Sequence, residues 1–348
     1  MFNLILIYLI IPIFCLWGMK INRLSTNVKT NTSLISKDMS LYIRGVATIG
    51  VVLCHFCVRL QEEERMHTLL KPIEFLGPLG VSLFFILSGY GLYLSSGLCK
   101  LHGSFIIKRL KSVYLPFVII LALFFPFHNI LELGISSVPQ SLLYLLGFKQ
   151  FFWFVTVITL LYIIYYFVSL VSNNPSKNIV ILFIATFILC VILHFLLGEN
   201  YSYWYGNNLC FPLGVLIAYK KDLIKQFFFE HYKKTIPITF VLLVMFSIGY
   251  YLTQGLARII DKSFLCTMFC MLVIQLIQFA TFNNTAIKWI GKNSLYIYII
   301  HTNIYIIMRH FLNMSNPVIT CLYFAIVLLF AYILNWIFKN TIFKTRIR

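Results

Sequence analysis

The sequence predicts an all-α protein that crosses a membrane many times, and three observations support this prediction. Of the 348 residues, 60% are hydrophobic and only 11% are charged, too few polar side chains to cover a water-soluble protein. Apolar stretches of membrane-spanning length recur along the whole chain, separated by short polar segments. Because lipid offers no hydrogen-bond partner to an open backbone, helices are the expected form of these stretches.

We expect about eleven transmembrane helices, namely one additional N-terminal helix followed by a ten-helix core. Polar turns such as residues 173–177 (NNPSK) and 313–317 (NMSNP) mark the boundaries between later helices. The expected spans are residues 2–19, 42–60, 75–97, 113–131, 151–171, 179–197, 204–219, 235–253, 264–282, 294–312 and 318–337.

Residues 1–20 are predicted to form an anchor helix that stays attached to the chain. The apolar run has no basic segment before it and no small-residue cleavage site after it, unlike a cleaved signal peptide. Residues 21–38 are predicted to be a polar cytoplasmic linker and residues 39–338 a single transmembrane domain. Residues 339–348 are predicted to be a basic cytoplasmic tail.

The basic residues predict the orientation, because Lys and Arg concentrate in cytoplasmic loops. An external N-terminus and eleven spans place the C-terminus in the cytoplasm. This arrangement leaves only seven of the 28 Lys and Arg outside: Arg59, Arg65, Lys71, Lys149, Arg258, Lys262 and Arg309. Topology therefore explains the net charge of +18, and we expect a plasma membrane protein surrounded by lipid, with no nucleic-acid partner.

The segment CHFC, residues 54–57, contains thiols and an imidazole that could suggest a metal site. On a helix, His55 points about 100° away from Cys54 and about 200° away from Cys57. The three side chains cannot bind one ion unless the helix breaks, and no Gly or Pro breaks it there. We therefore expect no metal.

Two helices carry polar residues on one face. Arg44 lies three turns and about 20° before His55, so the two side chains share a face about 16 Å apart along the axis. In the stretch 294–312, polar residues at spacings of four, three and four form a second line: Ser294, Tyr298, His301 and Tyr305. Such residues inside a membrane usually face a cavity with a function. The alternative is a seam of hydrogen bonds between helices.

Five short motifs occur in order along the chain: RGVATIGVVLCHF (44–56), GVSLFFILSGY (80–90), FIIKRLKSVYLP (105–116), FFWFVTVITLLYIIY (151–165) and GKNSLYIYIIH (291–301). Together they resemble the membrane-bound acyltransferase-3 family, integral membrane O-acyltransferases of glycans. That family has Arg or Lys, ten intervening residues and His in its first core helix, a spacing that Arg44 and His55 keep.

Two departures from the family pattern concern the second and third motifs. Ser82 stands where the family often has Asp. From Arg109, the third residue on is Ser112, where the family usually has a second Arg. Lys108 and Lys111 keep this spacing one position earlier, so the charge is retained but bidentate phosphate binding is weakened.

The resemblance implies transfer of an acyl group, usually acetyl, from cytoplasmic acetyl-CoA to a hydroxyl of an extracytoplasmic or lipid-linked glycan. Arg44 and His55 would then be catalytic, and imidazole, with a pKa of about 6.5, suits a general base that activates an alcohol. A covalent acetyl-histidine remains open. A non-enzymatic polysaccharide or lipid transporter is the alternative function.

The remaining candidate residues each have a second interpretation. Lys108, Arg109 and Lys111 could bind the phosphates of coenzyme A, or supply ordinary cytoplasmic charge. Ser88 and Gly89 could line a channel for the pantetheine arm, or allow close helix packing. Trp153 could stack on a sugar or belong to the interfacial aromatic belt, and the Ser294–Tyr305 line could border the substrate.

Overall fold

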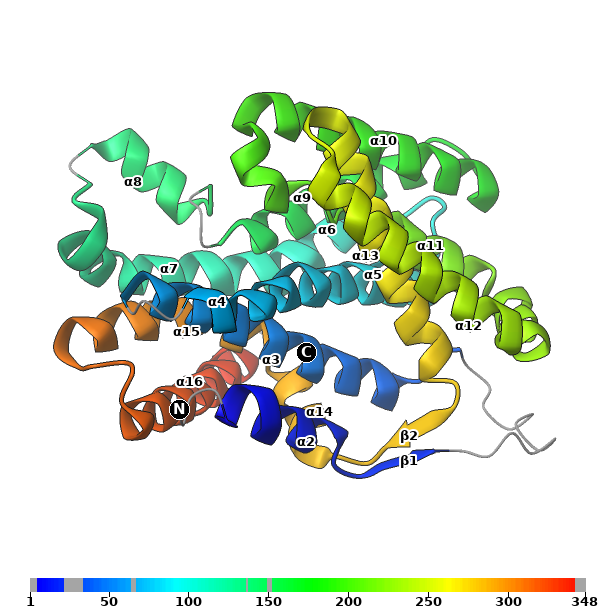
Figure 1. Ribbon diagram of the computed structural model, residues 1–348. Coiled ribbons are helices and arrows are strands. Elements are labelled where there is room, and N and C mark those ends of the chain that lie inside the picture. Colours follow the sequence, from blue (N-terminus) through cyan, green and yellow to red (C-terminus); the bar gives the residue numbers. More distant parts are fainter. Residues whose placement is uncertain (1–4, 22–33, 64–66, 136, 149–151, 342–348) are drawn as a thin grey trace.

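A computed structural model describes residues 5–21, 34–63, 67–135, 137–148 and 152–341, and most of these residues are helical (Figure 1). The elements are η1 (Leu6–Ile10), α2 (Ile11–Leu16), β1 (Met19–Ile21), α3 (Lys37–Glu63), α4 (His67–Leu70), η3 (Lys71–Phe75), α5 (Leu76–Ser96), α6 (Ser104–Arg109), η4 (Leu110–Tyr114), α7 (Leu115–His128), η5 (Asn129–Leu133), α8 (Val138–Leu145), α9 (Trp153–Ser169), α10 (Pro175–Leu197), η6 (Glu199–Trp204), α11 (Cys210–Tyr219), α12 (Lys221–Leu252), α13 (Gly255–Leu276), β2 (Ala280–Phe282), α14 (Thr285–Lys292), α15 (Ser294–Phe311) and α16 (Pro317–Thr341).

Seven helices among the described residues are long and apolar enough to cross a membrane. They are Lys37–Leu60, Lys71–Ser96, Ser104–Leu133, Pro175–Leu197, Glu230–Leu252, Gly255–Leu276 and Pro317–Thr341. Three shorter apolar helices accompany them: Leu6–Leu16, Trp153–Ser169 and Cys210–Tyr219. The protein is therefore a helical multi-pass membrane protein, whereas the count of eleven spans and the orientation stay predictions.

The N-terminal segment differs from the helix expected over residues 2–19. Helical structure ends at Leu16, and the chain turns at Gly18, whose φ of +78° suits a residue without a Cβ. Residues Met19–Ile21 then form β1, which pairs antiparallel with β2. The expected helix is present as Leu6–Leu16 but ends earlier than predicted, because apolarity alone does not distinguish a helix from a strand that finds a distant partner.

Two other expected spans have different bounds in the structure. The span expected over 264–282 is helix Gly255–Leu276 followed by strand β2, and the span expected over 204–219 is α-helical only from Cys210. Asn207 and Asn208 precede this helix, and both are buried with side-chain amides bonded to backbone carbonyls. Asn side chains that bond to the backbone favour turns over helix interiors, which explains the late start.

Two predicted segments fall partly outside the described residues. Of the linker expected over 21–38, residues 22–33 lie outside, while Leu34 and Ile35 are buried and α3 begins at Lys37. Of the basic tail expected over 339–348, residues 342–348 lie outside.

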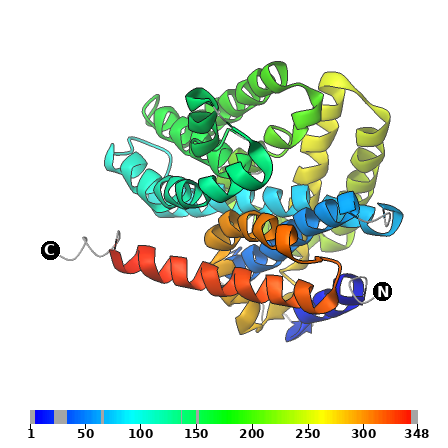
Figure 2. The ribbon, with the colours of Figure 1, turned by 90° about the vertical axis from the view of Figure 1, so that its left-hand side faces the viewer.

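Glycines let the central helices approach closely. A Cβ at Gly45 of α3 would overlap the Ile287 carbonyl of α14, and one at Gly291 of α14 would overlap the backbone of α3. Gly89 of α5 meets the Phe211 carbonyl of α11 in the same way. Small residues at such contacts are the usual means of packing helices within a membrane. Helix α16 then runs beside α15 on one side of the bundle (Figure 2).

Candidate active site

Helices α3 and α15 bring two histidines into direct contact. The Nδ1 atom of His55 lies 2.7 Å from Nε2 of His301, and the two rings are nearly parallel, with centroids 5.0 Å apart. The contact follows from the packing below it, where α14 leads into α15 and its Gly291 lies against α3 near Gly45. Close approach at the glycines thus sets the spacing of the helices where the histidines meet.

The hydrogen bonds of the pair determine which nitrogens carry protons. His301 Nδ1 lies 3.2 Å from the Ile297 carbonyl, which can only accept, so Nδ1 of His301 is the protonated nitrogen. In the neutral ring its Nε2 is then an acceptor, and His55 donates to it through Nδ1–H. Nε2 of His55 keeps its lone pair. This arrangement orients His55 as a base toward whatever approaches Nε2.

Only one of the two histidines retains accessible surface. His301 is 1% exposed, whereas His55 is half-buried in spite of its position within the helix bundle. Thr302 adds a hydroxyl 3.2 Å from Nε2 of His301, on the concealed side of the pair. His55 is therefore the more exposed member of the pair, and His301 lies behind it.

The other residues of the polar line on α15 lie at different levels of the helix. Tyr298 packs its ring 5.8 Å from that of His301 and is nearly buried. Tyr305 contacts Phe56, the neighbour of His55, and is also nearly buried. Ser294 is the first residue of α15 and is half-buried, two turns from His301. The line thus borders the pair without converging on one point.

Trp153 lies in an aromatic cluster at the start of α9. Its ring contacts Tyr203 and Trp204, and its exposed fraction is 7%. The next residue, Phe154, packs against Tyr298, with ring centroids 5.2 Å apart. Trp153 is therefore connected to the histidine pair through two aromatic rings, and does not touch it directly.

An ion-pair cluster lies above the histidines at the end of α3. Glu132 of η5 accepts from Arg59 at 3.0 Å and from Arg309 at 2.5 Å, joining α3, η5 and α15. Arg59 lies four residues after His55, and its guanidinium is 6.0 Å from the ring of Tyr305. Sequence reasoning treated Arg59 and Arg309 only as external charges. The helical spacing of Arg59 from His55 was the signal that could have placed it at the site.

A third histidine, His128 of α7, is fully buried near the same cluster. Its Nδ1 lies 2.7 Å from the Tyr144 hydroxyl, and its Nε2 has no hydrogen-bond partner among the described residues. Burial raises the pKa of the Tyr144 phenol, and the Glu132 carboxylate raises it further. The phenol therefore stays neutral and can donate to His128.

A pair of arginines lies at the opposite end of the site. Arg109 places its guanidinium 5.9 Å from the ring of Tyr162 and 5.5 Å from that of Phe105. Arg44 interacts electrostatically with both Tyr162 and Arg109. Each arginine has a buried Nε without a hydrogen-bond partner, and neither takes part in an ion pair among the described residues. Two neighbouring positive charges with unused donors are suited to binding an anion.

Lys108, Lys111 and Gly89, three of the predicted binding residues, have other surroundings. Lys108 and Lys111 are exposed, so the structure separates them from Arg109, which points inward. Gly89 packs against α11, which agrees with the interpretation that this glycine allows close helix packing. Its neighbour Ser88 is half-buried.

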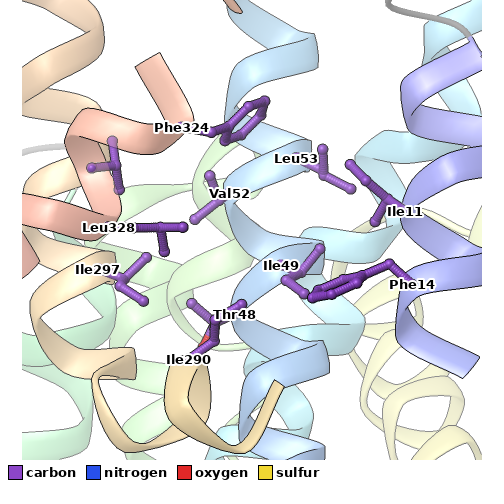
Figure 3. Close-up of a pocket in the computed structure, with 11 residues that line it drawn as sticks. Ile11, Phe14, Thr48, Ile49, Val52, Leu53, Ile290, Ile297, Phe324 and Leu328 are labelled. Carbon is purple, nitrogen blue, oxygen red and sulfur yellow. The ribbon is translucent and has the colours of Figure 1, made fainter. Parts of the chain in front are cut away.

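Figure 3 shows an apolar cavity of 160 Å³ between α2, α3, α14, α15 and α16. Phe14 of α2 and Leu53 of α3 lie on one side, and Ile297 and Leu328 on the other. Thr48 is its one polar residue, and neither histidine borders it. This cavity suits a hydrocarbon chain and lacks groups for acyl transfer.

A family model described as an acyltransferase domain, that of the acyltransferase-3 family, matches residues 42–336. No curated protein and no solved structure matches the chain significantly. The match begins within α3, ends within α16, and includes both histidines of the pair and both inner arginines. The chain therefore belongs to the acyltransferase-3 family of membrane acyltransferases.

Proposed function

We propose that the protein transfers an acetyl group from cytoplasmic acetyl-CoA to a hydroxyl of an extracytoplasmic or lipid-linked cell-surface polysaccharide. One observation carries the proposal: His55 contacts His301 at 2.7 Å, and its other ring nitrogen is left as a base on the half-buried side of the pair. The family match supports the reaction class, and the geometry of the pair supports His55 as the base.

Nε2 of His55 acts as the general base in this proposal. It removes the proton from the acceptor hydroxyl as the oxygen attacks the thioester carbonyl. The carbon–sulfur bond then breaks, and the proton passes from His55 to the departing thiolate, which leaves as free coenzyme A. His301 stabilises the transient imidazolium by accepting from Nδ1–H of His55. His55 ends the cycle in its starting form, so no other reactant is needed.

The two inner arginines bind the phosphates of the donor. Arg44 and His55 share one face of the continuous helix α3, separated by about 16 Å of helical rise. An extended pantetheine arm can bridge this separation, so phosphates at Arg44 and Arg109 leave the thioester near His55. Tyr162 holds the Arg109 guanidinium by a cation–π contact at 5.9 Å. Ser88 and Ser294 are both half-buried, and they are the candidates for lining the pantetheine arm between the arginines and His55.

The proposed orientation has the N-terminus outside, eleven spans and a cytoplasmic C-terminus in the plasma membrane. It places Arg44 and Arg109 on the donor side and His55 on the acceptor side. A fluorescent protein fused after Arg348 should be fluorescent in the cytoplasm, because its folding is supported there. A fusion that is translocated and dark would reverse the orientation, and with it the assignment of donor and acceptor sides.

The proposal is tested with the purified protein in vesicles that contain cell-surface glycan precursors and receive radiolabelled acetyl-CoA at the cytoplasmic face. His55→Ala should lower label transfer by about 10² or more, the usual contribution of a general base. His194→Ala is the matched control, because His194 also lies on a membrane helix but bonds to Tyr205, away from the pair. It should transfer label like the wild type.

Two variants of His301 separate positioning from packing. His301→Gln retains an oxygen that can accept from His55, so it should keep more activity than His301→Leu, which cannot. Acid-quenched wild type that carries label on a histidine would replace the base mechanism with a covalent acetyl-histidine. No label on glycan or protein, with glycan translocation intact in the wild type and in His55→Ala, would refute acyl transfer in favour of transport.

A further inference from the structure

A second cavity, of 260 Å³, lies between the η3–α5 segment and the pair α12 and α13, which run side by side (Figure 1). Neither His55 nor His301 lines it. Its charged and tyrosine lining residues are Lys71, Glu74, Tyr250, Tyr251, Arg258 and Lys262. Lys71 and Tyr251 are exposed, so the cavity opens to the surface.

Lys262 is the central observation, because it is only 6% exposed. Its ammonium contacts the Ser202 hydroxyl at 3.2 Å and lies 5.9 Å from the ring of Tyr250. None of the ion pairs among the described residues includes Lys262. A buried charge that meets only neutral groups is costly, and an anion within reach would offset this cost.

The nearby carboxylates do not supply that anion. Asp261 accepts from the Thr253 hydroxyl at 2.7 Å, and Glu199 accepts from the Gly255 amide at 2.9 Å. Glu74 lines the cavity but forms no ion pair within the described part of the chain. One carboxylate therefore faces three cations, and the cavity keeps an excess of positive charge.

The cations are also held in place before any ligand arrives. The Arg258 guanidinium lies over the ring of Tyr250, 4.8 Å from its centroid. Gly206 lies against the stem of Lys262, where a Cβ would come within 2.5 Å of Cδ. Fixed donors around a cavity lower the entropic cost of binding a small charged group.

We infer that this cavity is an oxyanion-binding site that takes a phosphate or carboxylate group. Lys262 would bind the anion from below, and Arg258 and Lys71 would bind it from the mouth of the cavity. Arg258 would supply bidentate hydrogen bonds to its oxygens. Such a group can come from a soluble acidic sugar or from an anionic lipid headgroup. The inference rests on this cavity alone and does not require acyl transfer.

The test measures thermal stabilisation of the full-length protein in nanodiscs, without acetyl-CoA and at constant ionic strength. In phosphatidylcholine discs, glycerol 3-phosphate and glucuronate are titrated as soluble probes, with glycerol and glucose as neutral controls. In a second arm, phosphatidylglycerol replaces part of the phosphatidylcholine. A ligand that binds only the folded protein stabilises it by RT ln(1 + L/Kd), where L is the free ligand concentration, so the melting temperature keeps rising with the logarithm of ligand concentration above Kd.

Arg258→Gln and Lys71→Gln are the principal variants, since neither residue is fully buried, and Lys262→Met is added where it folds. Arg258→Gln should weaken the apparent affinity about tenfold, the usual effect of losing one charge-assisted hydrogen bond. Lys177→Gln is the matched control, because Lys177 is an exposed cation on α10 that does not line the cavity. It should behave as wild type.

If the soluble probes stabilise the wild type and the cavity variants reduce this effect, the ligand is a soluble anion. Stabilisation by phosphatidylglycerol alone, reduced in the same variants, identifies a lipid headgroup. Either result supports an oxyanion site. The inference is overturned if no anion stabilises the protein more than its neutral control, or if Lys177→Gln reduces the effect as much as Arg258→Gln does.

Discussion

Substitution of Glu132 by Gln should destabilise the protein, because this one carboxylate holds two arginines from different helices. The side chains of Arg59, Glu132 and Arg309 are 10%, 12% and 30% exposed. Removing one partner of a buried ion pair costs about 3–5 kcal/mol, and the partial exposure of Arg309 favours the lower end. We expect Glu132→Gln to lower the free energy of unfolding by about 3 kcal/mol, roughly a hundredfold in the folded-to-unfolded ratio.

The change is measured by unfolding in mixed micelles, with helix content followed by circular dichroism. Asp38→Asn is the matched control, since Asp38 pairs with Lys288 at 2.7 Å but its side chain is 73% exposed. Exposed pairs contribute little, so this variant should unfold with the wild type. Equal destabilisation of the two variants would refute the reasoning, because it would mean that water screens the Glu132 cluster as fully as a surface pair.

A double variant tests the cause. If uncompensated positive charge is responsible, Arg59→Gln added to Glu132→Gln should recover part of the loss, because one of two facing guanidiniums is removed. If the double variant is destabilised by the sum of the two single effects, the loss comes from packing and not from charge.

Three further predictions follow from the contacts. Gly45→Leu should cost at least about 3 kcal/mol in unfolding free energy, because its side chain meets the Ile287 carbonyl, whereas Gly91→Leu has open space and should fold normally. Arg109→Gln should raise the Michaelis constant for acetyl-CoA in the vesicle assay, and Lys108→Gln, at an exposed neighbour, should not. Asn284→Ala should cost about 1 kcal/mol in the micelle assay, since Asn284 caps α14 and also binds the Phe14 carbonyl; an unchanged unfolding curve would contradict both roles.

Helical periodicity was sufficient to place Arg44 and His55 on one face, because α3 runs unbroken from Lys37 to Glu63. Periodicity describes one helix at a time, however. The contact of His55 with His301 depends on how α14 and α15 pack against α3, and the glycines that set this packing look ordinary in the sequence. Arg44 and Arg109 also lie on different helices, so the sequence pattern of either helix could not predict that they are neighbours.

Hydropathy located the apolar segments but did not predict the secondary structure that each one forms. The predicted span 204–219 combined helix Cys210–Tyr219 with the turn before it, because the aromatic residues of that turn are apolar. Their neighbours Asn207 and Asn208 bond to backbone carbonyls, which hydropathy does not detect. Topology rules counted Arg59 and Arg309 only as charges on the outer side, yet both form ion pairs with Glu132. Such partners come from distant parts of the chain, and no local pattern identifies them.

The pairing of β1 with β2 has a consequence for biosynthesis. Met19 lies opposite Phe282, so the first strand of the chain cannot find its partner until most of the protein has been synthesised. Contacts between such distant segments form late, since the loop that joins them must close first. The strand of the N-terminal segment should therefore pair late, after the helices from α3 to α13 have been synthesised. Ribosome-bound chains that end before residue 280 should leave the backbone of Met19–Ile21 open to protease, and the complete chain should protect it, because β1 is then hydrogen-bonded to β2.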